Sequence, residues 1–96
     1  MIGIRLLNGE VRHTANPRSF HIPTRAEREG VAVGGFVKCM FHDGTFTERM
    51  WVKVTRRNDD GSYTGELNND PAQITAIKCG DPVTLSPEHI IDILEK

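Results

Sequence analysis

Two cysteines and two histidines are the side chains in this sequence best suited to metal chemistry. Two residues separate Cys39 from His42, and nine separate Cys79 from His89. A structural zinc site needs four convergent ligands, and its ligand pairs are usually separated by about two to five residues. The second pair is too widely spaced, and Cys39 stands in an apolar run where a thiol behaves as a small hydrophobe. We therefore expect no metal site and no cofactor.

Cys79, Asp81 and His89 have the side-chain types of a nucleophile, an acid and a base. Covalent catalysis needs a nucleophile with its base within reach, and no nucleophile motif surrounds these residues. Gly34-Gly35 also lacks the spacing of a phosphate-binding glycine loop. We expect a protein that is not an enzyme.

Asn68, Asn69 and Asp70 stand before Pro71, where a strand is expected to end. Their side chains could hydrogen-bond a small ligand or a substrate, or meet a basic partner. Asn and Asp also bond nearby backbone in turns, and this structural role is the favoured interpretation. A small-ligand or enzymatic site near Asn68–Pro71 remains an alternative.

Arg49 and Trp51 belong to the residue types most enriched in protein-binding hot spots, because each combines apolar area with a polar group. Trp51 is also the only tryptophan. It could instead anchor the core with its indole N–H bonded to a backbone carbonyl. The core position is the favoured interpretation.

Lys53, Arg56 and Arg57 approach an expected hairpin loop. On a small β-barrel such residues can line a groove for single-stranded nucleic acid, with aromatic side chains supplying stacking. Asp59 and Asp60 in the adjoining loop oppose this role, and a net charge of −1 disfavours nucleic-acid binding in general. A solvated basic face is favoured, and a nucleic-acid-binding barrel remains an alternative.

The charge is unevenly distributed along the chain. Residues 1–57 contain ten Lys or Arg and five Asp or Glu, a balance of +5, whereas residues 58–96 contain two Lys and eight acids, a balance of −6. Two oppositely charged faces would result if the halves stayed apart in space. In a small barrel both halves contribute strands to one sheet, so the charges can intermix.

Runs rich in β-branched and aromatic residues, separated by Asn, Asp and Gly, predict a strand-rich chain. Alternation in the longest run places Met50, Val52 and Val54 on one face of a strand. The expected strands cover residues 2–7, 31–41, 45–55, 62–67 and 83–85.

Two helices are expected among these strands. Thr24 and Glu27 form a capping box for a short helix that ends at Gly30. Ser86 and Pro87 are typical of a helix start, and the expected C-terminal helix covers Ser86–Glu95. Residues 10–18 are polar and expected to form a loop. The fold class is thus α+β: a small, strongly bent antiparallel sheet or SH3-like barrel of about five strands, with a short internal helix and a C-terminal helix.

Length and composition set the broad class. Ninety-six residues suit a single domain, 1–96, and 38% apolar with 26% charged residues is ordinary for a globular protein. The first residues do not have the pattern of a signal peptide, and no apolar run of about 18 residues could span a membrane. Two isolated cysteines without a secretory signal favour a cytoplasmic protein.

Four blocks between Phe20 and Leu94 resemble a widespread, uncharacterised family of bacterial domains, typified by the YegJ C-terminal region. The blocks are Phe20-His21-Ile22-Pro23 with Arg28, Gly35 to Phe41, Glu48 to Val54 with Gly65 to Pro71, and Gly80 to Val83 with His89 to Asp92. Ile93 departs from the pattern, since an aromatic is expected there. The resemblance implies a compact α+β domain over residues 20–94, found in bacterial and phage contexts, and implies no activity.

The favoured function is that of a small binding or regulatory module for another protein. It would dock through the strand of Arg49 and Trp51 or through the turn at Asn68–Pro71. We expect a monomer or weak dimer and no membrane partner.

Overall fold

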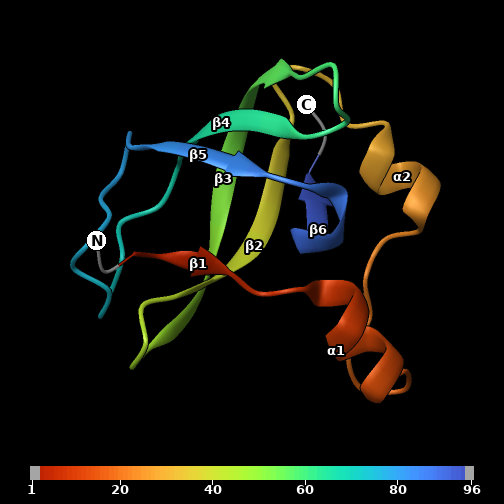
Figure 1. Ribbon diagram of the computed structural model, residues 1–96, viewed down its shortest axis with the longest axis horizontal. Coiled ribbons are helices and arrows are strands. Elements are labelled where there is room, and N and C mark those ends of the chain that lie inside the picture. Colours follow the sequence, from red (N-terminus) through yellow and green to blue (C-terminus); the bar gives the residue numbers. More distant parts are fainter. Residues whose placement is uncertain (1–2, 95–96) are drawn as a thin grey trace.

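The computed structural model describes residues 3–94, which form a bent antiparallel sheet flanked by two short helices (Figure 1). The elements in chain order are β1 (Arg5–Leu6), α1 (Gly9–Ala15), α2 (Arg25–Glu29), β2 (Phe36–His42), β3 (Thr47–Arg57), β4 (Tyr63–Leu67), β5 (Pro82–Leu85), the 3-10 turn η1 (Pro87–His89) and β6 (Ile90–Leu94). The predicted α+β class with a strongly bent antiparallel sheet is confirmed.

Strands β2, β3, β4 and β5 form a meander in which each strand pairs with the next. The opposite edge of β2 carries two further strands, β1 at one end and β6 at the other. The sheet curls into a half-barrel, and β5 returns through η1 to β6 (Figure 1). Within residues 3–94, β6 pairs with β2 and with no other strand, so its second edge is free of sheet hydrogen bonding.

The two central hairpins form where the sequence predicts turns. In the first, the Asp43 carboxylate accepts the N–H groups of Thr45 and Phe46 at 2.8 and 2.7 Å, and Gly44 takes the left-handed backbone region at φ 100°. In the second, Asp60 accepts the N–H of Ser62 at 2.9 Å. Short polar side chains therefore set the register of β2, β3 and β4 through local bonds.

The sheet has two faces with different roles. The inner face carries the main core, which includes Val37, Cys39, Phe41, Met50, Val52, Val54, Tyr63, Leu67, Val83 and Leu85. The outer face is covered at one end by a smaller cluster of Phe20, Met40 and Ile91. The predicted inward face of Met50, Val52 and Val54 is confirmed.

Trp51 lies on the outer face, partly exposed, because its inward-facing neighbours Met50 and Val52 leave it the opposite side of β3. It is absent from the buried core of the described residues. The favoured interpretation of Trp51 as the core anchor is therefore wrong.

The expected C-terminal helix over Ser86–Glu95 is also wrong. The helical start signal produces only the single turn η1, after which Ile90–Leu94 continue as a strand paired with β2. Three of these five residues are β-branched isoleucines, which favour extended backbone, and β2 offers an edge with hydrogen-bonding groups to satisfy. Leu94, the last described residue of this strand, is 57% exposed.

The expected loop over residues 10–18 contains the helix α1 instead. Asn8 is its N-cap, and its side-chain oxygen accepts the Val11 N–H at 3.0 Å. Asn is a residue type common to turns and helix N-caps, and here it starts a helix.

The predicted helix between Thr24 and Gly30 is confirmed as α2. The Glu27 N–H donates to the Thr24 hydroxyl at 3.1 Å, and the Thr24 N–H donates to the Glu27 carboxylate at 2.8 Å. This reciprocal box satisfies two N–H groups that a helix start leaves without partners. In the described part of the chain, no helix has the length and apolarity needed to cross a membrane.

Candidate functional site

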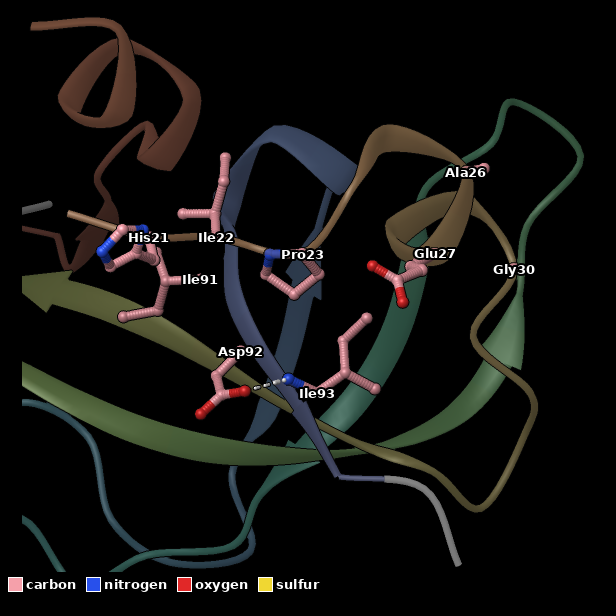
Figure 2. A pocket seen from close by; sticks show the side chains of 9 residues that line it. All are labelled: His21, Ile22, Pro23, Ala26, Glu27, Gly30, Ile91, Asp92 and Ile93. Carbon is pink, nitrogen blue, oxygen red and sulfur yellow. Dashed lines mark hydrogen bonds between the residues drawn. The ribbon is translucent and has the colours of Figure 1, made fainter. Parts of the chain in front are cut away.

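A groove of about 740 Å³ runs between β6 and the segment that leads into α2 (Figure 2). This volume falls within the range of ligand-binding clefts, about 300–1,000 Å³. One wall comes from residues 21–23 and from α2 with the glycine that ends it, and the other comes from β6. The lining residues are His21, Ile22, Pro23, Ala26, Glu27, Gly30, Ile91, Asp92 and Ile93.

The free edge of β6 borders this groove. The backbone N–H of Ile93 donates to the carboxylate of its own neighbour Asp92 at 2.8 Å, as Figure 2 shows. An unpaired strand edge presents backbone groups that another chain can pair with, and proteins often protect such edges with charged side chains. Asp92 gives β6 that protection at one position.

Acidic groups dominate the charge of the groove. Glu27 and Asp92 contribute carboxylates, His21 contributes an imidazole, and none of the nine lining residues is Lys or Arg. The pKa of Glu27 is lowered, first by the backbone hydrogen bond from Thr24 and then by the Thr24 side chain, so Glu27 is ionised at neutral pH. The remaining lining side chains are apolar, apart from Gly30.

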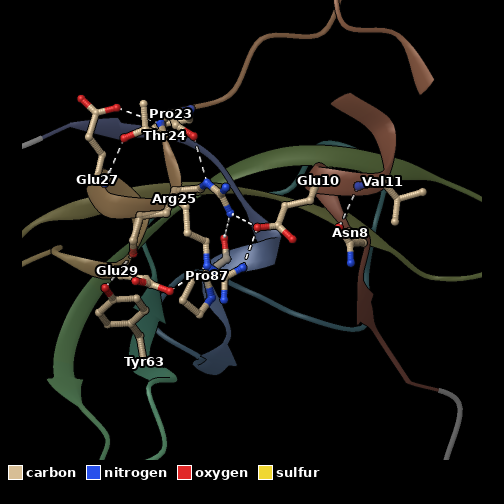
Figure 3. A network of polar contacts seen from close by, with 11 residues as sticks. Asn8, Glu10, Val11, Pro23, Thr24, Arg25, Glu27, Glu29, Tyr63 and Pro87 are labelled. Atoms are coloured by element: carbon tan, nitrogen blue, oxygen red, sulfur yellow. Dashed lines mark hydrogen bonds and ion pairs between the residues drawn. The ribbon is translucent and has the colours of Figure 1, made fainter. Parts of the chain in front are cut away.

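A buried arginine, Arg28, binds the α2 wall to its surroundings, and Figure 3 labels its partners Glu10, Pro23 and Pro87. Arg28 is 4% exposed and donates to the carbonyls of Pro23 and Pro87 at 2.9 and 3.0 Å. Its guanidinium also pairs with the Glu10 carboxylate of α1 at 2.6 Å. The hydroxyl of Tyr63 in β4 donates to the Arg28 carbonyl at 2.7 Å. This network ties α1, α2 and η1 to one another and, through Tyr63, to the sheet.

A smaller hollow continues from the groove onto the outer face of the sheet. It shares His21, Ile91 and Asp92 with the groove and adds Ser19, Phe20, Lys38 and Arg49. Two cations rest on aromatic rings there: the Lys38 Nζ lies 4.8 Å from the Trp51 ring centroid, and the Arg49 Cζ lies 5.3 Å from that of Phe20. Such cation–π contacts are weakly favourable at exposed sites and leave the charges available to a partner.

The predicted turn Asn68–Pro71 sits against Trp51 through backbone contacts. The Trp51 N–H donates to the Asn69 side-chain oxygen at 2.6 Å, and the Asn68 N–H donates to the Trp51 carbonyl at 2.8 Å. The second contact extends the pairing of β3 with β4 by one residue, and the first adds a side-chain acceptor beside it. Asp70 is exposed. The structure thus brings Trp51, Asn68 and Asn69 together, with the Asn69 side-chain oxygen already occupied by the Trp51 N–H.

Glu48 anchors the loop that follows this turn. Its carboxylate accepts three successive backbone N–H groups, those of Ala72, Gln73 and Ile74, at 2.8, 2.7 and 2.6 Å. These bonds, with the Ile74 N–H first and the Ala72 N–H second, lower the pKa of Glu48. The loop's backbone anion site is therefore filled by the protein's own carboxylate.

Of the three basic residues proposed for nucleic acid, Lys53 and Arg57 lie in different surroundings. Lys53 is exposed on the outer face, with Phe36 on one side and Glu66 on the other as strand neighbours. Arg57 donates to the carbonyls of Val31 and Glu29 at 3.3 and 3.1 Å and so fastens the end of α2 to β3.

Arg56 is exposed and follows a bulge in the pairing of β3 with β4. It lies beside Arg57 in sequence, and its Cα partner across the sheet is Thr64.

The cysteines and histidines considered for chemistry occupy separate places. Cys39 is fully buried in the core, where burial raises the pKa of its thiol, whereas Cys79 is exposed. His42 meets the Thr47 hydroxyl at 2.8 Å, and His89 accepts the Ser86 N–H at 3.0 Å. Within residues 3–94, no three His, Cys, Asp or Glu side chains gather in a way that could hold a metal ion.

A family model matches residues 21–95, which is most of the chain. The family is DUF2314, described as an uncharacterized protein conserved in bacteria. The chain belongs to this family. The predicted resemblance to an uncharacterised bacterial family is thereby confirmed. No curated protein and no solved structure matches the chain.

All nine groove residues lie within the range matched to DUF2314, whereas α1 precedes it. Sequence reasoning assigned no site to these residues, although it placed five of them in the blocks that carry the family resemblance: His21, Ile22, Pro23, Ile91 and Asp92. The capping box of α2 and the isoleucine-rich run of β6 can be recognised from neighbouring residues in the sequence. The proximity of α2 and β6 cannot be predicted in this way, because it depends on the pairing of β6 with β2 and on the bonds of Arg28.

Proposed function

We propose that this DUF2314 domain is a protein-interaction module that holds an extended segment of a partner in the groove between α2 and β6. One observation carries the proposal: a groove of about 740 Å³, lined by apolar and acidic side chains, runs along a strand edge that no other strand of residues 3–94 covers. Extended peptides bind such edges through main-chain hydrogen bonds, and neighbouring pockets select their side chains.

The groove residues favour binding over catalysis. The lining offers His21, Glu27 and Asp92 as acid–base groups, but no Ser, Cys, Thr or Lys that could act as a nucleophile. The Glu27 carboxylate is already occupied by the Thr24 N–H, and that of Asp92 by the Ile93 N–H. These contacts support a module without catalytic machinery of its own.

The outer face supports a second candidate function, the binding of single-stranded nucleic acid. Lys38 lies over Trp51, and Arg49 and Lys53 extend from the same face of β3. None of these three cations forms an ion pair within residues 3–94. Cations beside a partly exposed aromatic ring suit a phosphate backbone and a stacked base. Glu66 and Asp92, which flank the three cations in the sheet, weaken this candidate.

Selection of peptides from a random display library on the purified full chain tests the protein-binding proposal. The tightest peptides are then measured against Ala26→Trp, which fills the groove from α2, and against Ala76→Trp as a control. Both alanines are exposed, and Ala76 does not line the groove. We expect binding to weaken at least about tenfold in Ala26→Trp, because a pocket filled by a bulky ring loses the main-chain contacts of an added strand. Binding to Ala76→Trp stays as in the unchanged protein.

Equal binding to both tryptophan variants, or failure to select any peptide, contradicts the proposal.

An oligothymidylate titrated into the protein at low salt examines the second candidate, with the fluorescence of Trp51 as the signal. Quenching that disappears at high salt, and in a variant with Lys38→Glu and Arg49→Glu, would transfer the function to the outer face.

A further inference from the structure

We infer that the partner segment binds as an additional β-strand on the outer edge of β6, with a Lys or Arg side chain directed at Asp92 and Glu27. This inference rests on the proposed function and specifies its occupant: an extended, apolar and basic stretch of a partner protein.

Helix α1 limits the part of the β6 edge with which an added strand could pair. A Cβ placed on Gly9 would lie 2.7 Å from the Ile91 Cγ2 atom and 3.6 Å from the Ile90 carbonyl oxygen. The start of α1 therefore covers the beginning of β6. The groove opens beyond this point, at Asp92 and Ile93, so an added strand would pair at that end.

Asp92 is a displaceable cap on this edge. Its carboxylate accepts the Ile93 N–H at 2.8 Å, the donor that a carbonyl of an incoming strand would need. An exchange of one hydrogen bond for another keeps the donor satisfied throughout. The carboxylate released by the exchange is then free to meet a cation on the incoming strand, because directly opposed residues of antiparallel strands lie in contact.

The charge of the groove favours a basic residue on the bound segment. Neither Glu27 nor Asp92 forms an ion pair in the described part of the chain, and the groove lining holds no Lys or Arg. The nearest strand neighbour of Asp92 is Lys38, whose Nζ lies over the Trp51 ring. A lysine or arginine on the bound segment would supply the missing counter-charge, whereas an acidic residue would face two carboxylates.

The test uses a fluorescein-labelled heptapeptide of alternating Val and Lys with blocked ends. The first comparison peptide has Glu in place of Lys, and the second carries N-methyl groups on alternate amides. We expect the Glu peptide to bind at least about fivefold more weakly, through loss of attraction at two exposed carboxylates. We expect the methylated peptide to bind at least about tenfold more weakly, because several main-chain hydrogen bonds are lost.

Two substitutions at Asp92 separate its charge from its cap. Asp92→Asn keeps an oxygen that can accept the Ile93 N–H and removes the charge, so the preference for Lys over Glu falls. Asp92→Ala removes both the charge and the cap. We therefore expect the Glu peptide to bind Asp92→Ala more tightly than it binds Asp92→Asn. Thermal melting of both variants checks that they fold.

Equal binding of the Lys and Glu peptides, or undiminished binding of the methylated peptide, overturns the inference. If library-selected peptides bind in the groove while all three heptapeptides fail, strand addition by a basic segment is wrong and the interaction module stands. If no selected peptide binds either, the proposed function fails as well.

Discussion

Arg28 shows how one side chain can join segments that are far apart in the sequence. Arginine is usually exposed, yet Arg28 is 4% exposed and bonds to groups 18 and 59 positions away, at Glu10 and Pro87. Its burial is tolerated because a carboxylate and two carbonyls satisfy its donors. Nothing in the local sequence distinguishes it from Arg25, which is three positions earlier and largely exposed.

Replacement of Arg28 by methionine should destabilise the fold. The change keeps much of the apolar stem but leaves the carbonyls of Pro23 and Pro87 without their donor. Loss of one partner of a buried pair typically costs about 3–5 kcal/mol, and we expect about 3 because Glu10 is partly exposed and keeps Arg25. The free energy of unfolding in urea measures the loss.

Arg25→Met is the matched control for this substitution. Arg25 bonds to the same Glu10 oxygen at the same 2.6 Å, but its side chain is 54% exposed. Exposed pairs contribute little to stability, so the urea midpoint should hardly move. Equal losses in the two variants would show that Arg28 acts as a surface residue, contrary to the structure.

Trp51 illustrates what can be predicted for a single residue. The alternation of Met50, Val52 and Val54 already assigned these side chains to one face and therefore assigned Trp51 to the other. The expectation of a core tryptophan relied on residue type, and the strand's periodicity was the better guide. The contact of Trp51 with Lys38 could not be predicted in this way, because Lys38 belongs to another strand.

At the scale of the element, Gly65 of β4 stands where β3 leaves no room for a side chain. A Cβ at this position would collide with the Lys53 carbonyl and lie 2.8 Å from the Val52 Cγ1 atom. The close approach stands next to a register shift between Val54 and Arg56. A glycine inside a strand often marks such a site.

We expect Gly65→Ala to lower the free energy of unfolding by about 1–3 kcal/mol, because the added methyl group forces β3 and β4 apart. Glu66→Ala, at the neighbouring exposed position, should leave stability nearly unchanged. Chemical denaturation of both variants gives the comparison. An unchanged midpoint for Gly65→Ala would mean that the two strands can separate without loss of packing.

β6 marks the limit of sequence reasoning for elements. Hairpins and the capping box of α2 were predictable because their signals lie within a few residues. Whether Ile90–Leu94 form a strand or a helix depends on an open edge of β2, about 50 positions earlier in the chain. The same long-range pairing creates the groove, so the candidate site could not be derived from local patterns.

At the scale of the whole molecule, several titratable groups act on stability in the same direction. Burial lowers the pKa of His89, whose Nδ1 accepts the Ser86 N–H. The hydrogen bond to Arg28, followed by that to Arg25, lowers the pKa of Glu10, and backbone N–H groups lower that of Glu48. In each case the unfolded chain binds the proton more readily, so acid favours unfolding.

We expect stability to fall in two stages as the pH decreases from 7.5, with His89 responsible for the first and the carboxylates for the second. The His89 contribution is complete above its ordinary pKa of 6.5 and is lost as the pH falls through its lowered folded value. The contributions of Glu10 and Glu48 are complete above 4.5 and are lost below it in the same way. Urea unfolding across this range measures both stages.

His89→Gln should remove the first stage and leave the second, because glutamine can also accept the Ser86 N–H and does not titrate. His21→Gln, at an exposed histidine, is the control for loss of an imidazole. A first stage that persists in His89→Gln would assign it to another group.

The bond between Glu10 and Arg28 has a practical consequence for the choice of a fragment of this protein. The family match begins at residue 21, yet the buried guanidinium inside the matched range takes its counter-charge from α1, which lies before it. A fragment trimmed to the matched boundary would leave that cation without its carboxylate and uncover the start of β6 at Gly9. The Glu10–Arg28 ion pair therefore joins the residues before position 21 to the matched range.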